Sequence, residues 1–145
     1  MALTREQMDA KLDEHFAFEA ADDVEGVLAT LTEDVDHDIV GSPTGPVRGR
    51  HAARAFYEGL FPDLADGRVE SLRRYYGDDF MVDDSLWRGC APGRPFGIEG
   101  KGRPLEFRLL HVIEFAESGG IRRENVWIDL AAIQQQLPQD QGSGP

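Results

Sequence analysis

Apolar residues recur at helical spacing near the start of the chain. The tetrapeptide "TREQ" is a capping box, with Thr4 at the cap and Gln7 at the reciprocal position. The next apolar residues follow at four-residue spacing: Met8, Leu12 and Phe16. This pattern predicts an amphipathic helix over residues 5–20.

Two further helices and one strand are predicted in the next forty or so residues. In "DDVEGVLATL", Asp22 or Asp23 is the cap, and one apolar stripe follows: Val24, Val27, Leu28 and Leu31. "EDVDHDIVG" changes to a period of two, which predicts a strand with three residues on one face: Val35, His37 and Ile39. The loop "SPTGPVRG" then leads into a third helix, "RHAARAFYEGLF", which closes before Pro62.

The second half of the chain is typical of an antiparallel sheet. Four alternating stretches are separated by glycine-containing turns: residues 68–76, 79–89, 104–116 and 121–130. A short last helix is indicated by Leu130, Ile133 and Leu137 and ends at Pro138, and residues 138–145 are expected to be disordered. Helices first and strands later predict a single α+β domain over residues 1–137. Its strongly curved sheet, packed on the helices, is expected to form a cone with an internal pocket.

Composition narrows the partners of this domain. A chain of 145 residues with 41% hydrophobic and 29% charged residues is ordinary for one globular domain. The net charge of −12 argues against nucleic acid and against anionic membranes, because both are bound by basic surfaces. No apolar run approaches the ~20 residues of a membrane helix, and the N-terminus is too charged for a secretory signal. Small molecules and proteins remain as partners.

Cysteine and histidine usage bears on location and metals. The single cysteine, Cys90, excludes an internal disulfide and fits a cytoplasmic location. No clustered cysteine or histidine spacing indicates a metal site, so we expect that neither a metal nor an organic cofactor is needed.

Period-two alternation assigns each strand residue to a face. Three strands each place polar groups among apolar residues on one face: Asp83, Ser85 and Trp87; Phe107, Leu109, His111, Ile113 and Phe115; Asn125, Trp127 and Asp129. If these faces and that of His37 are concave, the pocket holds two histidines, two carboxylates and two tryptophans. Desolvation there moves carboxylate and imidazole pKa values toward neutrality. Glu124 points opposite to Asn125 and is excluded from this set.

Three stretches of the sequence carry a resemblance to a known family. They are "LTEDVDHDIVGSPTGPVRGRHAARAFYEGL", "DDSLWRGCAPG" and "GIEGKGRPLEFRLLHVIEFAESGGIRRENVWIDLAAIQQQL", and they cover most of residues 12–137. In this order they resemble the SnoaL-like polyketide cyclase branch of the nuclear-transport-factor-2-like superfamily. The resemblance implies a cone-shaped α+β barrel with a deep pocket and a homodimer. Outward residues such as Leu110 and Val112 are apolar enough to be covered in such a dimer.

The resemblance also implies an acid/base enzyme. In SnoaL-like cyclases an aspartate on the last strand is the proposed acid/base, and Asp129 in "NVWIDL" matches that position. With His111 or His37 as its partner, Asp129 is expected to move a proton on a hydrophobic, carbonyl-bearing molecule in a cyclisation, isomerisation or dehydration. The residues expected to bind the substrate are Trp87, Trp127, Asp83, Tyr57 and Asn125.

Each assignment has a structural alternative. Asp129 stands at a strand-to-helix junction, where an aspartate also caps a helix. His111 is equally consistent with a core histidine, His37 with a surface residue paired to its acidic neighbours, and Tyr57 with a structural role. The family also includes epoxide hydrolases and proteins with no known activity. A hydrolase, a non-catalytic small-molecule-binding protein and a dimerisation module therefore stay open.

Overall fold

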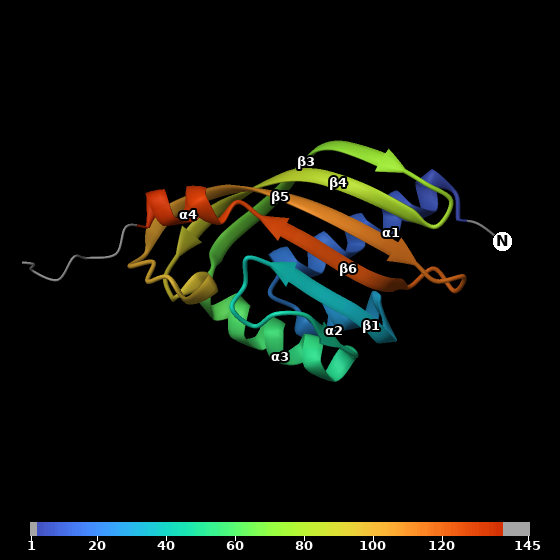
Figure 1. Cartoon of the computed structure of the whole chain (residues 1–145), viewed down its shortest axis with the longest axis horizontal. Helices are drawn as coiled ribbons and strands as arrows, with labels where there is room; N and C mark the ends of the chain where they lie inside the picture. The colour runs from blue at the N-terminus through green and yellow to red at the C-terminus, as the bar shows by residue number, and fades with distance from the viewer. Residues whose placement is uncertain (1–2, 138–145) are drawn as a thin grey trace, which may run out of the picture.

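The computed structural model describes residues 3–137, and helices cover one face of a curled sheet (Figure 1). The helices are α1 (Arg5–Ala20), α2 (Val24–Ala29), α3 (Arg50–Leu60) and α4 (Leu130–Gln136), with short 3₁₀ turns at Phe61–Asp63 and Pro95–Gly97. The strands are β1 (Leu31–Val40), β2 (Val47–Arg48), β3 (Ala65–Tyr76), β4 (Phe80–Ala91), β5 (Arg103–Phe115) and β6 (Ile121–Ile128). Residues 138–145, predicted to be a disordered tail, lie outside the described residues.

The strands of this part of the chain form one six-stranded sheet in the order β2-β1-β6-β5-β4-β3. Every neighbouring pair is antiparallel except β1 and β6, which are parallel. Figure 1 shows α1, α2 and α3 on one side of the sheet and α4 at one end of it. The predicted α+β cone, with N-terminal helices on a curved and mostly antiparallel sheet, is confirmed.

Local signals account for most element ends. The capping box of α1 forms as expected, since the backbone N–H of Gln7 donates to the Thr4 hydroxyl and the backbone N–H of Thr4 donates to the Gln7 side chain. Gly49, with a φ of 91°, turns the chain into α3 at a conformation that suits glycine. Two expectations are wrong in detail: Leu31 begins β1 rather than ending α2, and the predicted loop contains the short strand β2, paired with β1.

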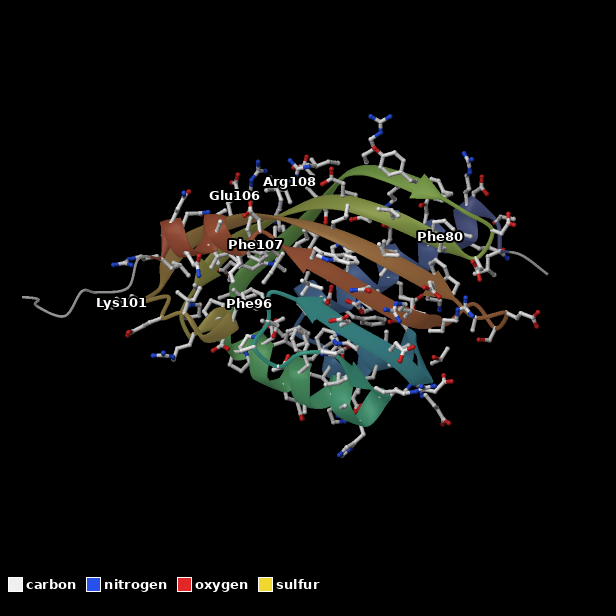
Figure 2. All side chains as sticks on the ribbon, in the orientation of Figure 1. Phe80, Phe96, Lys101, Glu106, Phe107 and Arg108 are labelled. Atoms are coloured by element: carbon white, nitrogen blue, oxygen red, sulfur yellow. The ribbon has the colours of Figure 1, made fainter. Side chains whose placement is uncertain are left out.

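Side chains alternate strictly along β5. Glu106 and Arg108 point outward and are exposed, whereas Phe107 between them is buried under the sheet (Figure 2). The ring of Phe107 stacks on Trp87 at a centroid distance of 5.3 Å. These two rings belong to a small apolar cluster, to which Ile133 of α4 and Leu137 also contribute.

The main core lies between the helices and the other end of the sheet. Its buried members come from α1, α2, α3 and four strands: Met8, Leu12, Val27, Leu28, Leu31, Val35, Ala53, Tyr57, Met81, Ile113, Phe115 and Ile121. Burying these side chains supplies the main driving force for folding. No helix within residues 3–137 is both long enough and apolar enough to cross a membrane.

Candidate active site

Three of the four strand faces were assigned correctly from the sequence. His37 on β1, Asp83 on β4 and His111 on β5 all point to the concave side, where at most 4% of each is exposed. Trp87 lies on the same side with 9% exposure. These four predicted site residues therefore share the concave side of the sheet, but the polar contacts among them are limited to His111 with Asp83, and Tyr57 of α3 contacts His37.

The face expected on β6 is wrong. Glu124 is 2% exposed and points inward, whereas Trp127 is 42% exposed and points outward. The register explains the difference: Glu124 lies opposite His37 of β1 and opposite Ile113 of β5, and paired residues share a face. Asn125 also lies on the outer face, where its amide donates to the carbonyl of Asp38. Asn125 and Trp127 therefore do not line the interior, and the carboxylate that was excluded does.

Asp129 is a helix cap on the outside of the molecule. It follows β6, is exposed, and accepts a hydrogen bond from the backbone N–H of Ala132 at 3.1 Å. The expectation that it opens onto the pocket is wrong, because its side chain is used at the start of α4.

A buried histidine of α1 connects the helices to the sheet. His15 has no exposed surface, and its Nδ1 lies 2.7 Å from the Thr30 hydroxyl. That hydroxyl donates its own proton to the carbonyl of Val27 at 2.6 Å, so it must accept from His15. On the other side of the ring, Nε2 lies 3.1 Å from Oε2 of Glu124 and 3.6 Å from Oε2 of Glu19.

Tyr57 extends this network to the second buried histidine. Its hydroxyl donates to the carboxylate of Glu124 at 3.1–3.2 Å and lies 3.1 Å from Nε2 of His37. Because the single phenolic proton goes to Glu124, Nε2 of His37 carries a proton and donates to Tyr57. The interior thus holds a chain of polar groups in the order Glu19, His15, Glu124, Tyr57 and His37.

The buried groups differ in charge. Burial works against a charge on His15, but the carboxylates of Glu124 and Glu19 outweigh it and raise the pKa of His15 well above 6.5. Burial would raise the pKa of Glu124, yet His15 above all, with His37, lowers it to about 2. Burial lowers the pKa of His37, and Glu124 only partly offsets this. At neutral pH the network therefore contains an imidazolium, a carboxylate and a neutral imidazole.

A second polar pair lies on β4 and β5. Nδ1 of His111 lies 3.4 Å from Oδ1 of Asp83 and 3.4 Å from the hydroxyl of Ser85. Oδ2 of Asp83 accepts from Ser71 at 2.6 Å and from Arg74 at 2.8 Å. Burial would raise the pKa of Asp83, but the contacts with His111, Ser71 and Arg74 together hold that pKa well below its usual range.

The contact between His111 and Asp83 is a close approach rather than a hydrogen bond, because Oδ1 of Asp83 is buried without a hydrogen-bond partner among the described residues. An ionised carboxylate only accepts hydrogen bonds, so a proton on Nδ1 of His111 is the arrangement that suits Oδ1. A carboxylate–imidazole pair of this kind orients the ring and supports the charge that forms when Nε2 takes up a proton.

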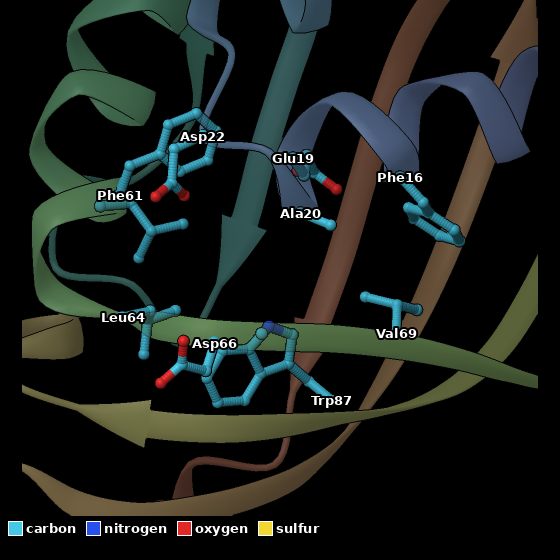
Figure 3. A pocket seen from close by; sticks show the side chains of 11 residues that line it. Phe16, Glu19, Ala20, Asp22, Phe61, Leu64, Asp66, Val69 and Trp87 are labelled. Carbon is cyan, nitrogen blue, oxygen red and sulfur yellow. The ribbon is translucent and has the colours of Figure 1, made fainter.

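An apolar pocket opens where α1 ends above β3 and β4 (Figure 3). Its volume is about 90 Å³, and Phe16, Leu64, Val69 and Trp87 are among its walls. Three carboxylates also line it: Glu19, Asp22 and Asp66. Of the predicted substrate-binding residues, Trp87 reaches this pocket, as Figure 3 shows.

Two side chains link the pocket to the buried polar groups. Glu19 lines the pocket and faces Nε2 of His15. Phe16 also lines it, and its ring packs on that of His111 with a centroid distance of 5.0 Å. Three side chains of the polar network also have the spacing that suits a metal ion, because their ligand atoms lie within 4.8 Å of one another: His15, Glu19 and Glu124.

Sequence reasoning missed His15, Glu19 and Glu124. The stripe assigned to α1 used Phe16, but the buried side chains of that helix are Met8, Leu12 and His15. The spacing from Leu12 to His15 to Glu19 is three and then four residues, which places these side chains on one helix face. His15 and Glu19, four residues apart on the same helix face as Leu12, were the sequence signal for a polar site under this helix.

The fold and the site define a cone-shaped α+β protein of the nuclear-transport-factor-2-like type, with titratable groups in its interior. The profile of the SnoaL-like domain matches residues 12–124, and the chain belongs to this family. No protein of curated function matches the sequence.

Solved structures agree with this fold. A candidate SnoaL-like polyketide cyclase from Jannaschia sp. CCS1 aligns with a TM-score of 0.81 and 16% identity over 97% of this chain and 99% of that chain. A candidate polyketide cyclase from Xanthomonas campestris pv. campestris aligns with a TM-score of 0.80 and 18% identity, over 92% and 98%. An epoxide hydrolase of the LEH-like type from M. tuberculosis aligns with a TM-score of 0.71 and 14% identity, over 90% and 89%. At these identities the likeness concerns the fold.

Proposed function

We propose that this protein is an acid/base enzyme that moves a proton on a hydrophobic, carbonyl-bearing small molecule, as in a cyclisation, isomerisation or dehydration. The observation that carries the proposal is the contact of His111 Nδ1 with the buried carboxylate of Asp83 at 3.4 Å. Because Nδ1 faces Asp83, Nε2 is the ring nitrogen that we assign as the base. His111 is not itself among the residues that line the pocket, and the ring of Phe16 connects it to the pocket wall. The names of the cyclases among the structural neighbours support the same class of reaction.

The corrected positions change the assignment of roles. Asp129, expected to be the base, caps α4 on the outside, and His111 takes its place as the proton-transfer group. Asp83, first assigned to substrate binding, becomes a positioning residue that acts through His111. His37 is neutral and hydrogen-bonded to Tyr57, which suits a supporting role behind the pocket.

The pocket also bears on the charge of the substrate. Glu19, Asp22 and Asp66 line it, and the whole chain carries a net charge of −12. An anionic substrate would be repelled by these carboxylates. The proposed substrate is therefore a neutral or cationic ketone whose apolar body packs against Trp87 and Val69.

The activity can be tested without knowing the natural substrate. Neutral enolisable ketones of graded size are incubated with the protein in D₂O, and exchange of the hydrogens next to the carbonyl is followed by NMR. Abstraction of a proton in the active site gives exchange faster than in buffer. The proposal is contradicted if some ketones bind the protein but none of them exchanges faster with the protein than in buffer alone.

A second candidate function is binding without turnover. It is favoured by the lining of the pocket, whose described residues include neither His111 nor Asp83. Binding of a ketone, seen as shifts in the spectrum of the protein, combined with no exchange would support this candidate.

We also propose that the protein is a homodimer formed through the outer face of the sheet. Val40, Leu110 and Trp127 are each about 40% exposed, and the strand register pairs Trp127 with both of the others. They form one apolar patch across three strands, the kind of surface that a second copy covers. Val112, also on this face, is partly buried.

The dimer is tested by light scattering at micromolar concentration. Trp127→Glu should convert the dimer to a monomer, because it places a carboxylate in the apolar patch. Ala55→Glu, which adds the same charge on exposed α3, should leave the mass unchanged. A wild-type protein with the mass of a monomer would contradict the proposal.

A further inference from the structure

The hydrogen bonds of His15 fix which ring nitrogen is left over. Thr30 donates to the carbonyl of Val27 at 2.6 Å and therefore accepts from Nδ1 of His15 at 2.7 Å. Nε2 makes no hydrogen bond to the described residues, although His15 is fully buried, and its contacts with carboxylates are ion pairs only. Buried polar atoms are normally satisfied, so an atom in this position calls for a ligand or a charge beside it.

Two carboxylates converge on this nitrogen. Oε2 of Glu124 lies 3.1 Å and Oε2 of Glu19 lies 3.6 Å from Nε2 of His15. The three ligand atoms all lie within 4.8 Å of one another. We propose that His15, Glu19 and Glu124 form a binding site for a divalent first-row transition-metal ion of the Zn²⁺ and Mn²⁺ class.

The spacing of the atoms suits such an ion. Bonds of about 2.0–2.2 Å to a common centre place adjacent ligand atoms roughly 3.0–3.5 Å apart in octahedral or tetrahedral geometry. The separations from Nε2, at 3.1 and 3.6 Å, are already close to this range. Glu19 has the most freedom to adjust, since 24% of its side chain is exposed, against 3% for Glu124.

The surroundings of the three ligands also match a metal site. A histidine ligand commonly donates its second ring N–H to a neighbouring acceptor, as His15 does to Thr30. A ligating carboxylate is commonly hydrogen-bonded in turn, as Glu124 is by the Tyr57 hydroxyl. Glu19 also lines the pocket, which gives an ion a path of entry to the site.

The donor set selects the class of ion. One imidazole nitrogen and two carboxylates suit Zn²⁺ or Mn²⁺, whereas Mg²⁺ and Ca²⁺ prefer all-oxygen sites. Binding of the ion replaces the Nε2 proton of the His15 imidazolium, which is released to solvent. The two carboxylates then neutralise a divalent ion bound to a neutral imidazole, which favours the ion in a buried position.

This inference goes beyond the proposed function and does not depend on it. Proton transfer at His111, positioned by Asp83, needs none of the three ligands, and metal binding is measured without any substrate. It departs from the expectation that the chain needs no metal, because histidine and glutamate ligands from α1 and β6 meet only in the folded chain.

The test is equilibrium dialysis of the full chain without an affinity tag. The protein is first treated with a chelator and then dialysed against Zn²⁺, Mn²⁺ or Mg²⁺, and bound metal is measured by mass spectrometry. Wild type should bind Zn²⁺ or Mn²⁺ in an amount equimolar with the chain and should not bind Mg²⁺. Glu19→Gln, at a partly exposed position, should retain the fold and lose this binding.

Two further variants separate the site from adventitious binding. Tyr57→Phe removes the hydrogen bond to Glu124 and should weaken metal affinity by ~10–100-fold, as outer-sphere changes do. His51→Gln removes an exposed histidine on α3 and should bind as wild type does. The inference is overturned if wild type binds neither ion, or if Glu19→Gln binds as well as wild type.

Discussion

Nε2 of His15 lies 3.1 Å from Oε2 of Glu124, and both side chains are buried. This ion pair joins α1 to β6, the sixth strand of the sheet in chain order. It stands at the centre of the interior network, because Glu124 also accepts from Tyr57.

Replacing Glu124 by glutamine should destabilise the protein strongly. The change keeps the shape of the side chain and leaves the charge of His15 without its main partner. Breaking a buried pair in this way typically costs about 3–5 kcal/mol of the free energy of unfolding. Urea unfolding of the metal-free protein measures the loss. Glu25→Gln is the control, because it removes an exposed pair with Arg54 and should cost less than about 1 kcal/mol.

Acid should weaken the fold through Asp83. Its pKa in the folded protein lies well below the ordinary value of 3.8, which applies to the unfolded chain. The unfolded chain therefore takes up the proton first as the pH falls. The stability contributed by this carboxylate is complete above about pH 4 and is lost progressively below it. In urea unfolding between about pH 6 and pH 2.5, wild type should lose more stability than Asp83→Asn. Equal losses in the two proteins would show that Asp83 does not contribute.

Because Asp129 caps α4, its replacement by asparagine and by alanine should affect the stability of the protein differently. Asp129→Asn should leave the thermal midpoint almost unchanged, because asparagine caps about as well as aspartate. Asp129→Ala removes the acceptor for the backbone N–H of Ala132 and should cost about 0.5–2 kcal/mol. Thermal unfolding of both variants checks this, and a large loss in the asparagine variant would argue for a role that needs the charge.

The inward position of His111 could be predicted from the sequence, whereas the position of Asp129 could not. Alternation along β5 placed His111 inside correctly, since apolar residues on both sides share its face. On β6 the residues Val126, Trp127 and Ile128 are all apolar, so hydrophobicity does not tell which face is inner. The register with β1 decides it, and register depends on tertiary pairing.

The charge of Glu124 misled the assignment for a related reason. A lone carboxylate is expensive to bury, which argues for an outward position. Its burial is compensated by His15 on α1 and Tyr57 on α3, and no sequence spacing connects these elements to β6. The class of fold, in contrast, follows from the order of helices and strands alone.

Phe16 should control the size of substrate that reaches His111. Its ring lines the pocket and packs on His111, so Phe16→Ala should enlarge the pocket toward that histidine. Exchange of bulky ketones should then rise relative to that of small ones. Because Phe16 is partly exposed, the loss of stability should stay below the ~3–5 kcal/mol of a fully buried phenylalanine.

A matched control lies on the same helix. Phe18 is also partly buried but does not line the pocket, so Phe18→Ala should lower stability without altering the size preference. A size preference that is the same in Phe16→Ala and wild type would contradict the role given to Phe16.

The most direct test of the proposed function compares one rate in three proteins. For a ketone that wild type exchanges in D₂O, the rate of exchange is measured with wild type, His111→Gln and Asp129→Asn. If His111 is the base, His111→Gln should lower the rate by ~10²–10⁴-fold while remaining folded, as loss of a general base does. Asp129→Asn should exchange at the wild-type rate. A folded His111→Gln protein with the wild-type rate, or a loss of exchange confined to Asp129→Asn, would contradict the account.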